Sequence, residues 1–120
     1  MQRLFLLLFV MTITGLSAQV KNISITEVPE KLLERGVLVD VRTPVEFEEG
    51  HLPGALNIDV KSEEFINEVS GIRKNRNVLL YCRSGRRSAR AAEILDSLGY
   101  KKVYNLEGGY LAWDAAKNEQ

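Results

Sequence analysis

The residues best suited to chemistry lie in one short basic segment around the only cysteine of the chain. The segment is Cys82-Arg83-Ser84-Gly85-Arg86-Arg87-Ser88. A cysteine reacts as its thiolate, and both a helix N-terminus and nearby cations lower the pKa of a thiol. Three arginines at the expected start of a helix repel one another and the helix dipole unless an anion binds there. The segment therefore predicts a nucleophilic thiolate, Cys82, inside an anion-binding loop.

The backbone of this loop is expected to supply the rest of the anion site. Gly85 can adopt conformations that a side chain forbids, so the turn can point several N–H groups inward and form an anion-binding nest. We expect substrate contacts from the six residues after the cysteine, which are Arg83, Ser84, Gly85, Arg86, Arg87 and Ser88. Which arginine points inward is left open, and one of them is free to face solvent or to pair with an acid.

The elements around this loop predict a sheet with helices on both faces. Apolar runs at 37–41 and 78–81 indicate buried central strands. Weaker patterns predict strands at 23–28, 55–58 and 103–105. Helices are expected at 29–35, from 44 to Gly50 at the latest, at 62–70, at 88–98, and from Gly108 onward. Because strands alternate with helices, we expect a mostly parallel α/β sheet, with Cys82 at the carboxyl end of a strand, where ligands of such sheets bind.

A capping box is predicted at the helix that starts near 44. Thr43 is a capping residue, Pro44 suits the first helical position, and Glu46 follows the cap by three residues. Capping is accordingly the role that we expect for Glu46.

Other residues that could take part in a reaction can also be explained by a structural role. Asp40 and Arg42 end the neighbouring central strand, and we expect them either to border the site or to form a buried ion pair between strand and loop. His51, the only histidine, lies in a turn, and we favour a structural role for it. Tyr110 and Trp113 are expected to anchor the last helix in the core. One cysteine and one histidine cannot supply a zinc site, so no metal is expected.

The first residues differ in kind from the rest. Arg3, an apolar run at 4–11 and small residues up to Ala18 predict a secretory signal peptide over 1–18. An uncleaved anchor is the alternative, but the run falls short of the ~20 apolar residues that span a membrane. We therefore expect an exported protein, periplasmic or secreted, whose mature domain covers 19–120 without stable membrane insertion. Its lone cysteine can form no internal disulfide.

Composition indicates one globular domain. The chain has 120 residues, of which 45% are hydrophobic and 27% charged, and its formal net charge is zero. A neutral chain gives no sign of a nucleic-acid or anionic-membrane partner, so any attraction for an anion must be local. Nothing in the sequence demands more than a monomer.

Three motifs resemble those of rhodanese-like domains. They are the stretch from Asp40 to Phe47 with Gly50 to Ala55, the loop from Cys82 to Ser88, and Gly108-Gly109-Tyr110-Leu111-Ala112-Trp113. The resemblance covers 23–117, nearly the whole mature chain. It implies a three-layer α/β/α fold with a five-stranded parallel sheet, and an enzyme without a cofactor.

The resemblance also implies a reaction. Sulfane sulfur moves from a small anionic donor such as thiosulfate to an acceptor such as cyanide, a thiol or a thioredoxin-like protein, through a persulfide on Cys82. One alternative is a sulfur carrier or anion-binding module without efficient turnover. Another is a phosphatase or arsenate reductase, which resembles Cys-x5-Arg, whereas Arg87 here falls one position too early.

Overall fold

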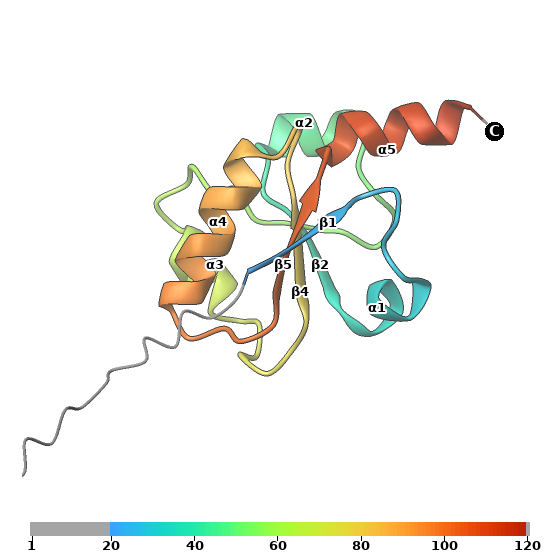
Figure 1. Ribbon diagram of the computed structural model, residues 1–120. Coiled ribbons are helices and arrows are strands. Elements are labelled where there is room, and N and C mark those ends of the chain that lie inside the picture. The colour runs from blue at the N-terminus through green and yellow to red at the C-terminus, as the bar shows by residue number, and fades with distance from the viewer. Residues whose placement is uncertain (1–19, 120) are drawn as a thin grey trace, which may run out of the picture.

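The strands of the protein form one parallel sheet. The computed structural model describes residues 20–119 and is shown in Figure 1. The five strands are β1 (Lys21–Ser24), β2 (Val37–Asp40), β3 (Leu56–Asn57), β4 (Val78–Tyr81) and β5 (Val103–Glu107). Their order is β1-β5-β4-β2-β3, and every neighbouring pair is parallel. β4 therefore lies at the centre of the sheet.

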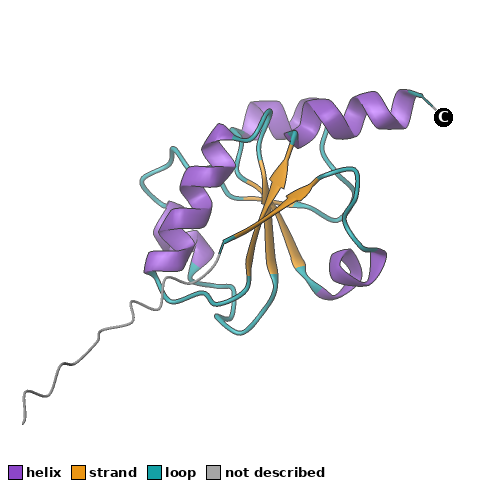
Figure 2. Ribbon diagram, viewed as in Figure 1, coloured by secondary structure: helices purple, strands orange, loops and turns teal. Residues whose placement is uncertain are grey.

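Helices cover both faces of this sheet (Figure 2). They are α1 (Glu30–Arg35), α2 (Pro44–Glu49), α3 (Phe65–Val69), α4 (Arg86–Ser97) and α5 (Gly109–Asn118). Successive side chains of a strand point to opposite faces, and β4 divides the core accordingly. Leu80 packs with Leu95 of α4, whereas Leu79 packs on the other face with Leu32 of α1 and Trp113 of α5. This arrangement is the predicted three-layer α/β/α fold.

Several element boundaries differ from the sequence prediction, four of them as follows. β1 ends at Ser24 rather than 28, because the chain turns there and the Glu27 N–H bonds to the Ser24 carbonyl. Residues 62–64 form a turn, so α3 begins at Phe65. α4 begins at Arg86, two residues before Ser88, because Gly85 already ends the turn. β5 continues past 105 to Glu107, since its last residues pair with β1.

The capping box at α2 is confirmed. The Thr43 hydroxyl accepts the Glu46 N–H at 3.3 Å, and Glu46 Oε1 accepts the Thr43 N–H at 3.3 Å. Proline occupies the first helical position, where its missing N–H costs nothing.

The predicted signal peptide, residues 1–18, lies outside the described residues, which are 20–119. Within 20–119, every helix is too short or too polar to cross a membrane.

A buried ion pair fixes the end of β2. Arg42 donates to both carboxylate oxygens of Asp40, with the shortest contact 2.6 Å from Nη2 to Oδ2. The same nitrogen donates to the Gly50 carbonyl at 2.6 Å, and the guanidinium lies 4.4 Å from the ring centroid of Tyr110. Both charged side chains are buried, so their mutual neutralisation is what makes this arrangement stable. Of the two roles expected for this pair, the ion pair between strand and loop is the observed one.

We predict that Arg42→Met lowers the free energy of unfolding by about 3–5 kcal/mol, because it leaves the Asp40 carboxylate buried without its partner. Urea unfolding measures this loss. The matched control is Arg73→Met at an exposed position, for which a change within about 0.5 kcal/mol is expected. A similar small change in Arg42→Met would show that the pair does not hold β2 in place.

Candidate active site

Cys82 follows β4 directly, and its loop folds around the sulfur. The side chain is 1% exposed and packs on the face covered by α4. The Gly85 N–H donates to Sγ at 2.9 Å. Gly85 has a φ of 125°, a conformation that a residue with a side chain rarely adopts, so glycine is what lets the turn close this tightly. The Ser88 hydroxyl, in the first turn of α4, lies 3.4 Å from Sγ.

These donors lower the pKa of the Cys82 thiol. Burial alone raises the pKa, because it disfavours the charged thiolate. Hydrogen bonds from the Ser88 hydroxyl and from the backbone N–H groups of Ser88, Gly85 and Ser84 act in the opposite direction and prevail. The sequence predicted a lowered pKa from the helix terminus and the arginine charges. The helix terminus contributes as expected, because Ser88, whose hydroxyl and N–H are the first lowering causes, lies in the first turn of α4, whereas the arginine charges are not among the causes of this pKa shift.

A buried amide holds the Ser88 hydroxyl beside the sulfur. Ser88 Oγ lies 2.7 Å from Asn105 Oδ1 of β5, and its single proton points either to that oxygen or, when Cys82 is a thiolate, to Sγ. Asn105 is itself buried, and its Nδ2 donates to Asn22 of β1 at 3.2 Å. A chain of polar contacts thus runs from β1 through β5 and α4 to Cys82.

The three arginines of the loop have different surroundings. Arg87 forms a two-pronged ion pair with Glu46 of α2, with N–O distances of 2.6 and 2.8 Å. This pairing, together with bonds from Thr43, lowers the pKa of Glu46 to about 2 even though burial acts against it. Arg83 and Arg86 are exposed and form no ion pair within residues 20–119. The arginine that pairs with an acid is therefore Arg87.

The back of the loop rests on the start of α5. Tyr110 donates its N–H to the Cys82 carbonyl at 2.8 Å, and Leu111 donates to the Arg83 carbonyl at 3.1 Å. Gly109 permits this approach, because a Cβ there would lie 2.5 Å from the Cys82 carbonyl oxygen. The C-terminal glycine motif thus supports the loop from behind.

Asp40, Arg42 and His51 do not join the loop. Arg42, which bonds to Asp40, lies 5.8 Å from the ring centroid of Tyr81, whose side chain packs on the sheet face opposite to that of Cys82. The His51 ring stacks on Phe47 with centroids 3.7 Å apart, and its Nδ1 lies 2.8 Å from the Phe47 carbonyl oxygen. His51 is therefore part of a turn, as expected.

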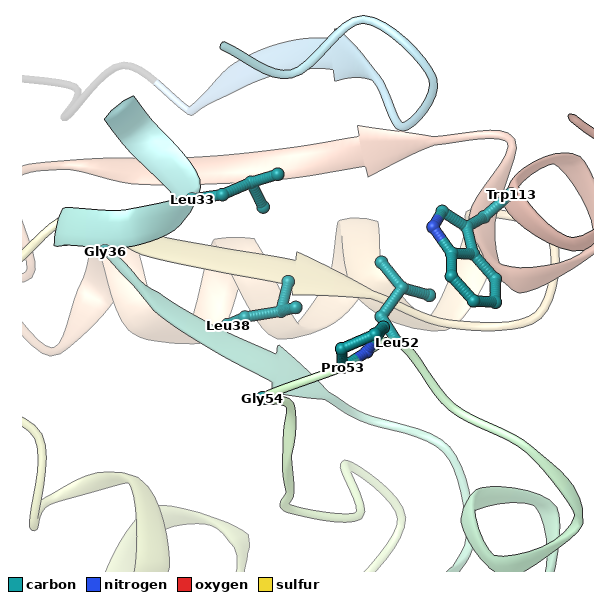
Figure 3. Close-up of a pocket in the computed structure, with 7 residues that line it drawn as sticks. All are labelled: Leu33, Gly36, Leu38, Leu52, Pro53, Gly54 and Trp113. Carbon is teal, nitrogen blue, oxygen red and sulfur yellow. The ribbon is translucent and has the colours of Figure 1, made fainter. Parts of the chain in front are cut away.

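A hollow on the α1 face is unrelated to this site. It has a volume of about 260 Å³ and contains no titratable side chain (Figure 3). Leu33, Leu38, Leu52 and Trp113 form much of its wall. Trp113 thus sits at the edge of the core, packed on its α1-side cluster.

The family model for the rhodanese-like domain matches residues 24–116 of this chain. The chain belongs to the rhodanese-like domain family.

Relatives of this rhodanese-like domain include proteins named sulfurtransferases. A "Sulfurtransferase" of Allochromatium vinosum is 44% identical over 77 residues, which cover 64% of this chain and 70% of that protein. A "Putative thiosulfate sulfurtransferase, mitochondrial" of Schizosaccharomyces pombe is 41% identical over 88 residues, covering 64% of this chain and 62% of that protein. A rhodanese-like domain protein from Staphylococcus aureus, whose crystal structure is known, is 36% identical in sequence. Its structure superposes with a TM-score of 0.68, and the match covers 78% of this chain and 90% of that chain. The five-stranded parallel sheet is therefore the rhodanese-like fold.

Sequence reasoning missed two contributors to the site in this rhodanese-like domain. Asn105 interrupts an apolar strand pattern, and an interruption of that kind in a buried strand is the signal that could have marked it. The pairing of Glu46 with Arg87 joins residues 41 positions apart, and no local pattern reports such a contact.

We predict that Ser88→Ala raises the pKa of Cys82, because it removes the hydroxyl that stabilises the thiolate, and a hydrogen bond to a charged group contributes ~1.5–3 kcal/mol. The rate of alkylation by iodoacetamide as a function of pH measures this value. In the unsubstituted protein the midpoint is expected below the ~8.5 of a free cysteine, because a lowered pKa produces the thiolate at lower pH. Ser97→Ala, which removes an exposed hydroxyl on the same helix, is the control. An equal midpoint in all three proteins would contradict this account of the thiolate.

We also predict that Gly109→Ala lowers the free energy of unfolding by about 1–3 kcal/mol, because the added methyl pushes α5 away from the Cys82 loop. Thermal and urea unfolding measure the loss. The control is Gly71→Ala, where the nearest atom to a new Cβ is 3.4 Å away. Equal effects of the two substitutions would show that the close approach at α5 is not required.

Proposed function

We propose that this domain is a sulfurtransferase that carries sulfane sulfur on Cys82. The proposal rests on one observation, which is that the buried Cys82 sulfur is surrounded by hydrogen-bond donors, with the Gly85 N–H at 2.9 Å and the Ser88 hydroxyl at 3.4 Å. Donors arranged in advance around a buried atom stabilise negative charge on it without reorganisation during the reaction. The names of the two sulfurtransferases from Allochromatium vinosum and Schizosaccharomyces pombe support the same reaction class.

The first step of the proposed reaction loads the cysteine. The Cys82 thiolate attacks the outer sulfur of thiosulfate and forms a new S–S bond. The bond between the two thiosulfate sulfurs breaks, and its electron pair leaves with sulfite. The persulfide then carries one negative charge on its outer sulfur, which the N–H groups of the loop are suited to hold. No general base is needed, because the environment already supplies the thiolate.

We assign different roles in the binding of thiosulfate to different groups of the loop. The N–H groups of residues 84–88 are assigned to the sulfur, and Arg83 and Arg86 to attraction of the anion, because these two arginines are exposed and free of ion pairs within 20–119. Arg87 is assigned to holding the loop against α2 through Glu46.

The second step returns the thiolate. An acceptor such as cyanide, a thiol or the cysteine of a thioredoxin-like protein attacks the outer sulfur and takes it from Cys82. A sulfur carrier that receives its sulfur from a protein and does not turn over rapidly needs the same loop. The two functions therefore differ in the rate of this second step.

The ion pair between Arg87 and Glu46 argues against phosphatase activity. A Cys-x5-Arg loop needs an arginine that is free to hold the phosphoryl oxygens. Arg87, the nearest candidate in the sequence, already donates both of its terminal nitrogens to Glu46. Hydrolysis of p-nitrophenyl phosphate tests this alternative directly.

We predict that the purified protein gains the mass of one sulfur atom on incubation with thiosulfate, and that adding cyanide removes this mass and produces thiocyanate. Intact-mass spectrometry and steady-state thiocyanate formation measure the two steps. Cys82→Ser is expected to gain no mass and to form no thiocyanate. Stable loading without turnover would favour the carrier function. Loading that persists in Cys82→Ser would overturn the proposal.

We also propose that the domain is exported after removal of residues 1–18. The support is the charged start, the apolar run and the small residues described above. The mass of the mature protein isolated from its producing cell tests the proposal, since an intact residue 1 would contradict it.

A further inference from the structure

Several acceptors compete for one proton beside Cys82. The Ser88 hydroxyl lies 2.7 Å from Asn105 Oδ1 and 3.4 Å from the Cys82 sulfur. The Gly85 carbonyl oxygen, at 3.1 Å, is a third acceptor. A hydroxyl has a single proton to donate, and Ser88 and Asn105 are both buried, so bulk water does not replace a contact that the hydroxyl gives up. The direction of this hydroxyl is therefore coupled to the charge on the sulfur.

The arrangement in the structure suits the thiol form of Cys82. Asn105 turns its Oδ1 to Ser88 and its Nδ2 to Asn22 Oδ1 of β1, which lies 3.2 Å away. With its proton on Asn105, the Ser88 oxygen is left to accept the proton of the Cys82 thiol. Each contact of this polar chain, which consists of Asn22, Asn105 and Ser88, then joins one donor to one acceptor.

The same arrangement does not suit the thiolate. A thiolate has no proton of its own, and the Ser88 hydroxyl donates to it. Ser88 Oγ and Asn105 Oδ1 then face each other at 2.7 Å with no proton between them. Two buried oxygens that both accept repel each other, and a buried acceptor without a partner costs free energy. A half turn of the Asn105 amide removes this conflict, because Nδ2 then donates to Ser88.

The far end of the polar chain is able to follow this turn. With its Nδ2 at Ser88, Asn105 presents Oδ1 to Asn22. Asn22 is exposed, so its amide has room to turn as well and to donate Nδ2 to that oxygen. Both directions of the polar chain therefore leave every buried polar atom paired.

We propose that Asn105 is a positioning residue whose amide turns over when Cys82 changes from thiol to thiolate. The polar chain donates away from the sulfur in the thiol and toward it in the thiolate. No proton moves along the chain, because only the amides and the hydroxyl rotate, and the thiol proton leaves to solvent. The proposal deepens the proposed function and rests on it for the role in sulfur transfer, since it names what holds the nucleophile in its reactive form.

The charged side chains around the loop are separate from the polar chain. Arg87 of α4 pairs with Glu46 of α2, and Asp59, which follows β3, raises the pKa of Arg87 by its charge. Arg83 and Arg86 are exposed. Among residues 20–119, the side chains of these five residues form no hydrogen bond with a member of the polar chain. Substitutions at the far end of the polar chain therefore leave these charges in place.

Asn22→Asp tests the turn, because a carboxylate only accepts and so keeps Asn105 Nδ2 on β1 and Oδ1 on Ser88. The midpoint of alkylation by iodoacetamide is expected to move to higher pH than in the unsubstituted protein. At a pH below the midpoint, the rate is expected to fall about threefold, which is the order of one hydrogen bond between neutral groups. The measurement is made at high ionic strength, which screens the new charge at this exposed position.

Two controls separate direction from charge and from contact. Thr26→Asp adds the same charge at an exposed position just beyond β1, and Asn22→Ala leaves Asn105 free to turn. Both are expected to match the unsubstituted protein. An unchanged midpoint in Asn22→Asp would overturn the proposal. An equal shift in Thr26→Asp would overturn it as a general effect of charge, and an equal shift in Asn22→Ala would overturn it as an effect of the lost contact.

Nuclear Overhauser contacts of the Asn105 Nδ2 protons report the turn directly. They are expected to point to Asn22 at a pH below the midpoint and to Ser88 above it. In Cys82→Ser, which forms no thiolate, they are expected to stay on Asn22 throughout. Contacts that stay on Asn22 at every pH in the unsubstituted protein would overturn the proposal. Failure to load sulfur from thiosulfate would instead overturn the proposed function and leave these contacts unaffected, so the two failures are distinguishable.

Discussion

The site depends on a balance between burial of the Cys82 sulfur and the hydrogen bonds that it receives. Burial disfavours a thiolate, and the N–H groups and the Ser88 hydroxyl around the sulfur favour it by a larger amount. The N–H donors are fixed by the backbone and the hydroxyl by the first turn of α4, so the balance depends on the conformation of the loop and on one buried side chain, Ser88. Gly85 is the residue that permits that conformation, because its φ of 125° closes the turn on the sulfur.

The rest of the fold holds this loop from three sides. β4 is buried on both faces and ends at the cysteine, which fixes the first residue of the loop. α5 bonds to the loop carbonyls from behind, and the Tyr110 ring rests on the Arg42 guanidinium, which is itself fixed by Asp40. α2 reaches the loop through the pair of Glu46 with Arg87. The three motifs that are separate in the sequence are therefore one contact network in space.

Patterns in the sequence predict what local physics determines. Three predictions are confirmed, because each depends on residues close together in the chain: the buried strand before Cys82, the capping box at Thr43, and the cysteine at the carboxyl end of a strand. The resemblance to the family added the number of strands. The boundaries of β1 and β5 were wrong, because pairing between strands far apart decides where they end. Of the two predicted causes of the lowered pKa, the helix terminus was right and the arginine charges were wrong. Arginine charges are visible in a sequence, whereas the direction of an N–H group is set by the folded turn.

The arginines consequently have a different physical role from the one that their number suggests. A charge at the surface is screened by water and salt, so Arg83 and Arg86 act weakly on the buried sulfur compared with an N–H group at 2.9 Å. The same exposure suits them to attract an anion before it reaches the loop, because attraction in solution requires charge that solvent can reach. Arg87 is the exception, since Glu46 neutralises it and turns it into a structural contact. Stabilisation of the thiolate and capture of the anion thus fall to different groups. The loop backbone and the buried Ser88 hydroxyl stabilise the thiolate, and the exposed arginines attract the anion.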